Sequence, residues 1–294
     1  MTVPVAGTSQ KFSKAKIDMR RILPFCLAAS ALAQTYFSVP GPDAPELAPM
    51  GTYTVGVRTI ELVNPGQVDI LKYNAESKSA PVADRRLKLE IWYPATLAAG
   101  EKAETIYESP MVGRAAPRPG MPSTFQIFGK AARDAAPRQG EKFPLVIVSH
   151  GYPGSRTFLS YLTENLASKG YVVAAIDHTD SVFGEIRAFS STLLNRSADQ
   201  LFVLESLSKQ TGGLPIDPSK AAIIGYSMGG YGALTSAGAG YNPKSAVASM
   251  VPGGYLEPWT AGNEKFATRR PANLKAIIAI APWGGQMNSW DNKG

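Results

Sequence analysis

A glycine-rich hexapeptide at residues 225–230, Gly-Tyr-Ser-Met-Gly-Gly, constrains the fold more than any other part of this sequence. An apolar run at 221–224 precedes it, which is typical of a buried strand, and a run of small residues at 231–237 can begin a helix. The chain must therefore turn sharply from strand to helix, with Gly225 and Gly229 where the two elements nearly touch. Such a turn raises the Ser227 hydroxyl above the sheet, beside the N–H groups of the helix start. The pattern predicts that Ser227 is a nucleophile.

A second motif, Ser-His-Gly-Tyr-Pro-Gly at 149–154, follows another apolar run. Two backbone N–H groups aimed at the oxygen of a tetrahedral intermediate can contribute about 3–4 kcal/mol each to its stabilisation. We assign these oxyanion-hole donors to the N–H groups of Tyr152 and Met228. His150 and His178 each lie at the end of a predicted strand, where a structural role is favoured over that of catalytic base.

Five spaced motifs lie at residues 89–94, 149–151, 177–180, 191–196 and 225–230. Together they resemble bacterial proteins described as predicted dienelactone hydrolases, which are related to the platelet-activating-factor acetylhydrolases. The resemblance extends over about residues 53–285 and implies an α/β-hydrolase fold, with a mostly parallel sheet flanked by helices. It also implies an acyl-enzyme on Ser227, a Ser-Asp-His triad and a small-molecule carboxylic ester of the short-chain acyl class as substrate. Dienelactone hydrolases themselves use a cysteine, so the substrate in their name is not expected here. The motifs are Leu-Glu-Ile-Trp-Tyr-Pro at 89–94, Ser-His-Gly at 149–151, Asp-His-Thr-Asp at 177–180, Ser-Thr-Leu-Leu-Asn-Arg at 191–196, and the hexapeptide at 225–230.

The sequence departs from this pattern after Ser227. In this fold the acid and the histidine of the triad follow the nucleophile, but His150 and His178 are the only histidines. No carboxylate follows the predicted strand at 275–281 directly, and Asp291 is a poor candidate for the acid. We therefore expect residues 53–294 to form an incomplete domain that lacks its last strands and helices, in a C-terminally truncated chain. A serine without its base is a poor nucleophile, so we expect this chain to be nearly inactive.

Two alternative functions remain open at this point. One is a non-catalytic binding protein, a pseudoenzyme that keeps the pocket without the base. The other is a polyester hydrolase or peptidase on the same fold, in which aromatic side chains line a groove. The same aromatics also suit ordinary packing. They are Tyr152, Tyr226, Tyr255, Trp259 and Trp283.

Strands and helices alternate from residue 143 onward, which predicts a parallel sheet with right-handed crossovers. Two earlier segments alternate apolar and polar residues, and the second stops at Pro94. Between them and the parallel part, 95–142 reads as a long surface excursion, and 240–273 reads as a loop. The predicted strands are 53–63, 87–93, 145–148, 171–176, 221–224 and 275–281, and the predicted helices are 157–169, 196–210 and the segment after Ser227.

The first 33 residues read as a signal peptide. Basic residues at 11–21 precede a twelve-residue apolar run at 22–33 that ends in Ala-Leu-Ala, and Met19 could be the start. The alternative, a membrane anchor, is disfavoured because a bilayer requires about 20 apolar residues. The pattern predicts a periplasmic or secreted protein, with a lead-in at 34–52 before the main domain.

The formal charge of +7 raises the possibility of a nucleic-acid partner. Five of the 30 basic residues and one of the 23 acidic residues lie in the leader, which leaves +3 for the rest of the chain. No other dense basic run is present, so no nucleic-acid binding is expected. The one cysteine, Cys26, is in the leader, and the two histidines are isolated, so we expect no metal and no organic cofactor. The sequence does not define an oligomeric state.

Overall fold

The computed structural model describes residues 49–110, 124–267 and 269–291. The predicted signal peptide at 1–33 lies outside these ranges, as does most of the lead-in at 34–52. Within them, the helices are all too short or too polar to cross a bilayer.

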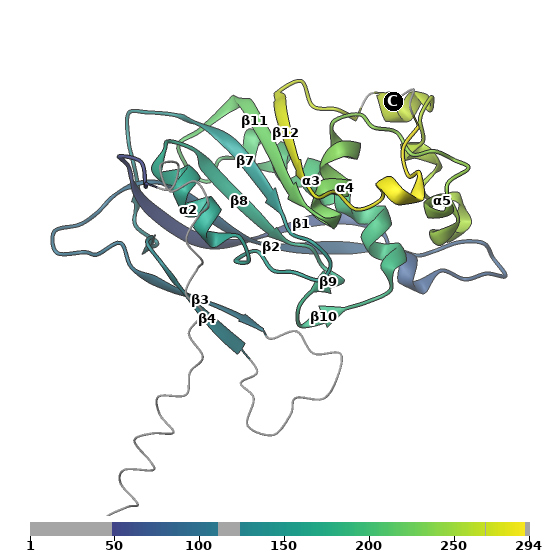
Figure 1. The fold of residues 1–294 in the computed structure, drawn as a ribbon, viewed down its shortest axis with the longest axis horizontal. Helices are drawn as coiled ribbons and strands as arrows, with labels where there is room; N and C mark the ends of the chain where they lie inside the picture. Colours follow the sequence, from purple (N-terminus) through teal and green to yellow (C-terminus); the bar gives the residue numbers. More distant parts are fainter. Residues whose placement is uncertain (1–48, 111–123, 268, 292–294) are drawn as a thin grey trace, which may run out of the picture. The chain divides into compact units, whose positions relative to one another are not determined.

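One sheet organises this part of the chain (Figure 1). Its strands lie in the order β12, β11, β7, β8, β2, β1 and β5, with β6 beside β2. The first four are parallel to one another, whereas β2 is antiparallel to both β8 and β1. The main strands are β1 (Thr54–Val68), β2 (Val82–Thr96), β7 (Phe143–Ser149), β8 (Val172–Asp177), β11 (Ile216–Tyr226) and β12 (Leu274–Ile280), and the short ones are β5 (Ala132–Arg133) and β6 (Ala136–Pro137). This mixed but mostly parallel sheet is the predicted fold class.

Helices cover both faces of the parallel strands, as the continuous apolar runs require. In β7, Leu145 and Ile147 pack in one cluster with leucines of α3 (Phe189–Lys209), while Val146 and Val148 pack in another with leucines of α2 (Ser160–Ser168). Helix α4 (Met228–Ser236) lies on the same face as α3. The two clusters form the core of the domain.

The chain leaves β7 in one direction across the sheet and later returns on its other side. It passes through α2 to β8, and then through α3 back to β11, on the opposite side of β7. Right-handed crossovers in opposite directions place their helices on opposite faces, so the direction of the chain reverses between the carboxyl ends of β7 and β11, where ligands bind in open α/β sheets. The motifs at 149–154 and 225–230 both lie at this position.

The segment 95–142, predicted as a long surface excursion, contains regular strands that the sequence did not indicate, while residues 111–123 lie outside the described ranges. Strands β3 (Thr105–Pro110) and β4 (Thr124–Gly129) pair as an antiparallel hairpin. Buried Tyr107 anchors it, because its hydroxyl accepts a hydrogen bond from Trp92 Nε1 at 2.7 Å and donates one to Glu164 at 2.5 Å. Because the hairpin is anchored through polar contacts with β2 and α2, its own sequence shows no apolar periodicity from which it could be predicted.

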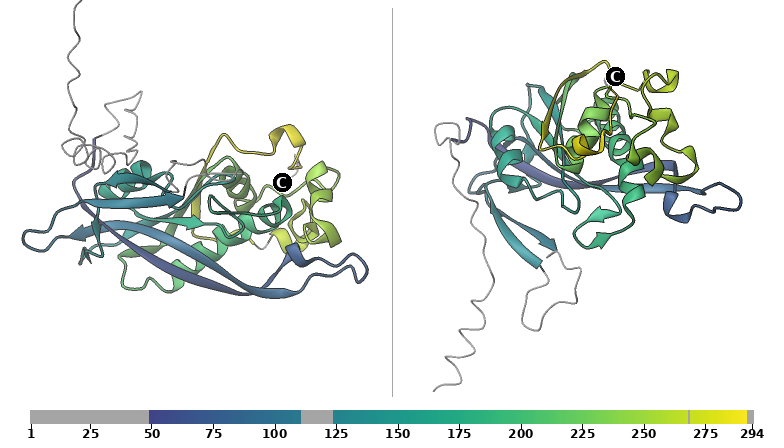
Figure 2. Two further views of the ribbon diagram at one scale, coloured as in Figure 1. Left: turned by 90° about the horizontal axis from the view of Figure 1, so that it is seen from below. Right: turned by 45° about the vertical axis from the view of Figure 1, so that its right-hand side comes forward.

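Strand β2 continues through Pro94 to Thr96, whereas the sequence predicted a stop at the proline. Proline lacks an N–H group and is tolerated in a strand where a neighbour does not need that donor. The pairing of β2 with β8 ends at Trp92, so nothing in β8 requires an N–H from Pro94. The β1–β2 ribbon is consequently long and twisted (Figure 2).

Two helix boundaries, the burial of β12 and the structure of one predicted loop also differ from the predictions. Helix α2 begins at Ser160 rather than at 157, and α3 begins at Phe189, seven residues before the predicted start, because its first turns bury polar side chains. Strand β12, predicted to be buried, leaves Ile278 54% exposed, since among the described residues it pairs only with β11. The predicted loop at 240–273 contains short helices. The remaining elements are β9 (Ser181–Val182), β10 (Glu185–Ile186), η2 (Ile70–Lys72), α5 (Ala246–Met250), η3 (Pro252–Gly254), η4 (Glu257–Trp259), α6 (Glu264–Ala267) and η5 (Gly285–Met287).

Candidate active site

Ser227 stands at the turn from β11 to α4 with a positive φ of 53° and a ψ of −113°. A residue with a side chain in this region is strained and persists only where its surroundings hold it. Here the Ser227 N–H donates to Ile280 O at 2.9 Å, and Ser227 O accepts from the Trp283 N–H at 3.0 Å. Strand β12 and the turn after it therefore fix the backbone of the serine.

Two glycines permit the close approach of strand and helix at this turn. A Cβ atom on Gly225 would overlap the carbonyl group of Gly229, and one on Gly229 would overlap the carbonyl group of Ser149. Both contacts are with backbone, which cannot move aside as a flexible side chain can. The geometry is that of a nucleophile elbow, with a half-buried serine at its tip.

The loop after β7 lies directly beside the serine. A Cβ atom on Gly151 would be 3.3 Å from Ser227 Cβ, so backbone rather than side chain faces the hydroxyl there. Tyr152 follows, with its ring edge-on to Phe189 at 5.0 Å and its hydroxyl donating to Arg187 O at 2.5 Å. Met228 is the first residue of α4, where N–H groups have no acceptor within the helix. The structure thus brings the three predicted site residues, Ser227, Tyr152 and Met228, to one place.

The buried side chain of Arg196 fixes the loop at 149–154 through hydrogen bonds to its carbonyl groups. Its guanidinium donates to His150 O at 2.7 Å, to Gly151 O at 3.4 Å and to Ser181 Oγ at 2.7 Å. His150 Nδ1 makes a further hydrogen bond of 2.7 Å with Gly151 O. In a trans peptide the C=O and N–H groups point in opposite directions, so fixing Gly151 O inward also fixes the direction of the Tyr152 N–H.

Burial of the Arg196 guanidinium disfavours its charged form, and the neighbouring groups offset this effect only in part. Burial lowers the pKa of Arg196 to about 9, although the nearby Asp199 carboxylate acts in the opposite direction. The guanidinium therefore remains charged at neutral pH. Its Nε has no hydrogen-bond partner among the described residues, so the hydrogen bonds to the loop carbonyls and Ser181 carry most of the compensation.

Neither histidine reaches Ser227, because all four ring nitrogens have other partners. His150 Nε2 accepts from the His178 N–H at 3.2 Å, and Nδ1 is bonded to Gly151 O. His178 Nε2 is 2.7 Å from Ser149 Oγ, and Nδ1 is 2.9 Å from Asp199 Oδ2. Burial lowers the pKa of both rings, that of His178 to about 3, so both are neutral.

Ser149, His178 and Asp199 are bonded in the order of a catalytic triad, but they form a buried structural relay. All three side chains are 0–1% exposed, so Ser149 cannot meet a substrate. Arg85 closes the relay with a bidentate bond to Asp199, at 2.7 and 3.0 Å, which helps to lower the pKa of Asp199 to about 2. The neutral imidazole of His178 lies between the ionised carboxylate of Asp199 and the hydroxyl of Ser149. Its two hydrogen bonds hold the ring in place and thereby fix the end of β7.

Sequence reasoning missed Arg85 and Asp199 entirely. The motifs at 177–180 and 191–196 contain His178 and Arg196, but only as part of a resemblance, without a contact to explain them. Residue types alone gave no signal, because Arg85 is 114 residues from the carboxylate that it pairs with.

The five aromatics of the groove interpretation do not form one surface. Tyr152 contacts Phe189, which contacts Trp283 at 5.1 Å, and both lie near the elbow with exposed Tyr226. Tyr255 instead packs edge-on to Tyr73 at the end of the β1–β2 ribbon. Trp259 lies under the guanidinium of Arg269, beside a different cavity. A continuous groove of all five is therefore wrong.

The other residues considered in the sequence, the candidate acid Asp291 and the single cysteine, can be placed only in part. Asp291 lies beside Gly240, to whose carbonyl its N–H donates at 3.1 Å. The part of the chain that the structure describes contains no group of three His, Cys, Asp or Glu side chains arranged to hold a metal ion. Cys26 lies outside the described residues.

Comparisons with known proteins find several hydrolases that are similar to this chain. Residues 124–200 match the family model of platelet-activating factor acetylhydrolase, isoform II. A cutinase of Thermobifida alba, "Cutinase est1", is 32% identical over 147 residues, which are 50% of this chain and 38% of the relative. The platelet-activating factor acetylhydrolase of Bos taurus is 50% identical over 50 residues, 17% of this chain and 11% of that protein. Among solved structures, a ferulic acid esterase from Streptomyces cinnamoneus has a TM-score of 0.46 and 24% identity, with coverage of 69% of this chain and 58% of that chain.

The sheet order, the strained serine between β11 and α4, and the sequence matches define the class: the chain is a member of the α/β-hydrolase superfamily. The resemblance expected from the five motifs is confirmed at this level. The chain spans well under half the length of the two curated relatives described above.

Proposed function

We propose that the protein is a serine-dependent hydrolase of carboxylic esters with short-chain acyl groups. Ser227 Oγ attacks the ester carbonyl carbon, and the N–H groups of Met228 and Tyr152 bind the oxyanion that forms. Collapse of this intermediate expels the alcohol and leaves an acyl-enzyme, which water then hydrolyses to the acid. The observation that carries the proposal is the approach of Gly151 to Ser227, which places the backbone of the 149–154 loop beside the nucleophile.

The names of the relatives support this class of reaction. The match to the family model of platelet-activating factor acetylhydrolase, isoform II, covers residues 124–200, which include the loop at 149–154. The sequence relatives include a cutinase and a platelet-activating factor acetylhydrolase. These proteins are named for the hydrolysis of ester-linked acyl groups. We extend only that shared chemistry to this chain, with a small-molecule ester as its substrate.

We further propose that residues 1–294 alone hydrolyse esters very slowly. The proton of Ser227 must pass to a base during the attack, but both imidazoles are neutral, buried and bonded elsewhere. In a triad enzyme, loss of the base lowers kcat on the order of a millionfold. The same observation favours a second candidate function, a non-catalytic binding protein that retains the oxyanion loop.

Turnover of p-nitrophenyl acetate by the purified 294-residue chain tests both statements. We expect a rate close to that of Ser227→Ala, and a rise on addition of imidazole in the wild type that Ser227→Ala does not share, because a free base can replace the absent one. Rapid turnover without imidazole, abolished by Ser227→Ala, would contradict the proposed inactivity but support the hydrolase. No Ser227-dependent rate and no labelling of Ser227 by a fluorophosphonate, even with imidazole, would favour the binding protein.

The proposed location is the periplasm or the exterior of the cell, because of the leader pattern at 1–33. Fractionation of cells that express the full sequence, with N-terminal sequencing of the exported product, checks this. Cleavage after Ala33 is the expected result, and a protein retained with its leader intact in the cytoplasm would contradict it.

A further inference from the structure

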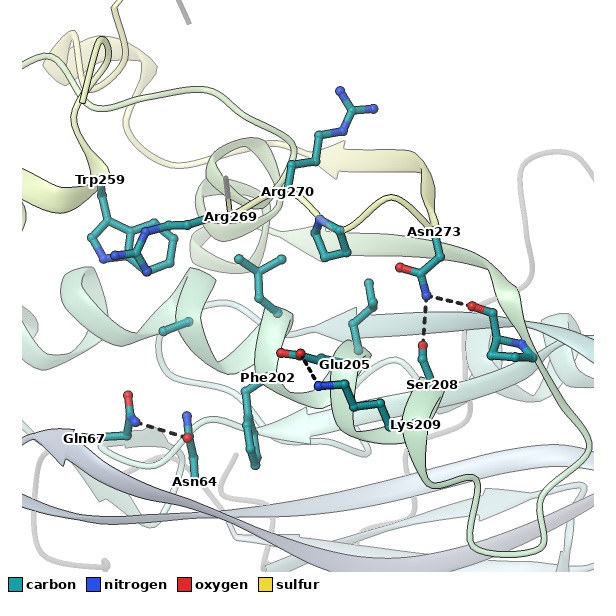
Figure 3. A pocket seen from close by; sticks show the side chains of 15 residues that line it. Asn64, Gln67, Phe202, Glu205, Ser208, Lys209, Trp259, Arg269, Arg270 and Asn273 are labelled. Atoms are coloured by element: carbon teal, nitrogen blue, oxygen red, sulfur yellow. Dashed lines mark hydrogen bonds and ion pairs between the residues drawn. The ribbon is translucent and has the colours of Figure 1, made fainter. Parts of the chain in front are cut away.

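A cavity of about 650 Å³ lies beside the C-terminal half of α3 (Figure 3). It is bounded by α3, the beginning of β11 and the segment that leads into β12. Its walls include Leu201, Phe202, Ser208, Trp259, Arg269 and Asn273. This volume is in the range of pockets that bind small molecules.

The cavity is separate from the candidate active site. Asn273 directly precedes β12, whereas Ile280, at the other end of that strand, accepts the hydrogen bond from Ser227. A strand rises about 3.3 Å per residue, which separates the two sites by roughly 23 Å. No residue of the elbow or of the 149–154 loop lines the cavity.

The charge of the cavity is positive. Its lining contains Lys209, Arg269 and Arg270 against the single acid Glu205. Glu205 is already paired with Lys209 at 2.6 Å. Neither arginine makes an ion pair with any residue that the structure describes. Two guanidinium groups therefore remain without a counter-ion.

Arg269 is held in place as a recognition group would be. Its guanidinium carbon is 4.2 Å from the centroid of the Trp259 ring, and Figure 3 shows the side chain extended along the indole. Stacking fixes the plane of the guanidinium and leaves donors at its edge for a planar, two-oxygen acceptor. Arg269 Nε is buried and has no acceptor among the described residues, and burial lowers the pKa of the group without an opposing carboxylate.

Part of the remaining wall is apolar and suits a carbon chain, while Asn64 and Gln67, which also line the cavity, are hydrogen-bonded to each other. Leu201 and Phe202 of α3 and Pro271 of the facing segment contribute carbon surface beside the guanidinium. Asn273 Nδ2 is engaged, because it donates to Ser208 Oγ at 3.0 Å and to Pro218 O at 2.9 Å. These bonds fix the far wall of the cavity.

We propose that this cavity binds an organic monocarboxylate with an apolar body, whose carboxylate pairs with Arg269 and whose carbon chain lies along Leu201 and Phe202. The site does not depend on the reaction proposed for Ser227. Arg270, which is exposed at the rim, adds to the attraction of the anion without being stacked.

Calorimetric titration of the 294-residue chain with octanoate tests the proposal. Two matched ligands separate the contribution of the charge from that of the apolar chain. Octan-1-ol has the same chain without the charge, and inorganic phosphate has charge without the chain. We expect saturable binding of octanoate, at least roughly tenfold weaker binding of octan-1-ol, and no competition from equimolar phosphate. Absence of octanoate binding, equal binding of octan-1-ol, or equal binding of phosphate would each overturn the proposal.

Variants then locate the site. Arg269→Met keeps an unbranched side chain over Trp259 but removes the charge, and we expect it to weaken octanoate binding at least roughly tenfold. Arg269→Lys keeps the charge without the planar fork and should retain part of the affinity. Lys244→Met removes an exposed cation that does not line the cavity, and Ser227→Ala alters the candidate active site; both should bind octanoate as the wild type does.

Circular dichroism and cooperative urea unfolding establish that each variant is folded. Wild-type affinity in folded Arg269→Met would overturn the proposal, as would a loss in Ser227→Ala equal to that in Arg269→Met. Should Arg269→Met fail to fold, folded Arg269→Lys decides the matter, because unchanged affinity there excludes recognition by the guanidinium fork.

Discussion

At Gly229 the carbonyl groups of Ser149 and His150 occupy the space that any larger side chain would need. We expect Gly229→Ala to destabilise the protein by about 3 kcal/mol, because the added methyl group can be accommodated only by moving the backbone of α4 or β7. Urea unfolding measures this effect.

Gly285→Ala is the matched control, since a Cβ atom there meets nothing within 4 Å. It should change the free energy of unfolding by less than about 0.5 kcal/mol. Equal effects of the two substitutions would show that the close approach of elbow and oxyanion loop is not the reason for the glycine.

The elbow serine and its glycines could be predicted from the sequence because their chemistry is local. A strand, a strained turn and a helix start fall within about fifteen consecutive residues, so their pattern is visible without a structure. The relay of Ser149, His178, Asp199 and Arg85 could not be predicted in this way, because its residues are far apart in the sequence. Its members come from four elements, and each residue type alone is compatible with a surface position.

Helices α3 and α4 approach closely through Gly232. A Cβ atom there would be 2.6 Å from Arg196 Cγ and 2.7 Å from Gln200 Nε2, both on buried side chains of α3. Alanine in a helix interior is favoured over glycine by about 1 kcal/mol, whereas overpacking costs about 1–3 kcal/mol. We expect the second effect to prevail, so Gly232→Ala should lower stability by about 1 kcal/mol in urea unfolding.

A double-mutant cycle tests this explanation. Gln200→Ala removes one of the two colliding groups but also its hydrogen bond to Gly229 O at 2.9 Å. If the collision causes the loss, the pair of substitutions should cost less than the sum of the two single ones. Strict additivity would contradict a steric origin.

At the same scale, element boundaries followed the sequence closely where the element is a continuous apolar run. The run at 145–148 lies within β7, and the run at 171–176 differs from β8 by one residue at each end, since both faces of these strands enter the core. The beginning of α3 could not be predicted, because Ser191, Thr192 and Asn195 are buried polar residues that interrupt the apolar stripe. The β3–β4 hairpin escaped prediction for a related reason, as Tyr107 is anchored through its hydroxyl.

For the whole molecule, the two buried histidines couple stability to pH. Unfolded histidine has a pKa of about 6.5, whereas burial lowers the pKa of His178 to about 3 and that of His150 well below its usual value. The unfolded state therefore binds protons that the folded state does not, so stability is fully present above about pH 6.5 and decreases as the pH falls toward 3. Asp199, with a folded pKa of about 2, stabilises the protein at neutral pH and loses this contribution only as the pH falls from about 4 toward 2.

Between pH 7 and pH 5 each histidine that stays neutral in the folded protein should cost about 2 kcal/mol of unfolding free energy. Urea unfolding at the two pH values should thus show a loss of about 4 kcal/mol in the wild type and about half of that in His178→Asn, whose amide keeps a donor for Asp199. Glu164, whose pKa burial raises, titrates in both proteins and cancels in the comparison. An equal loss in wild type and His178→Asn would mean that the ring is accessible to protons in the folded state, and the relay beneath the oxyanion loop would then be open to solvent rather than a fixed part of the core.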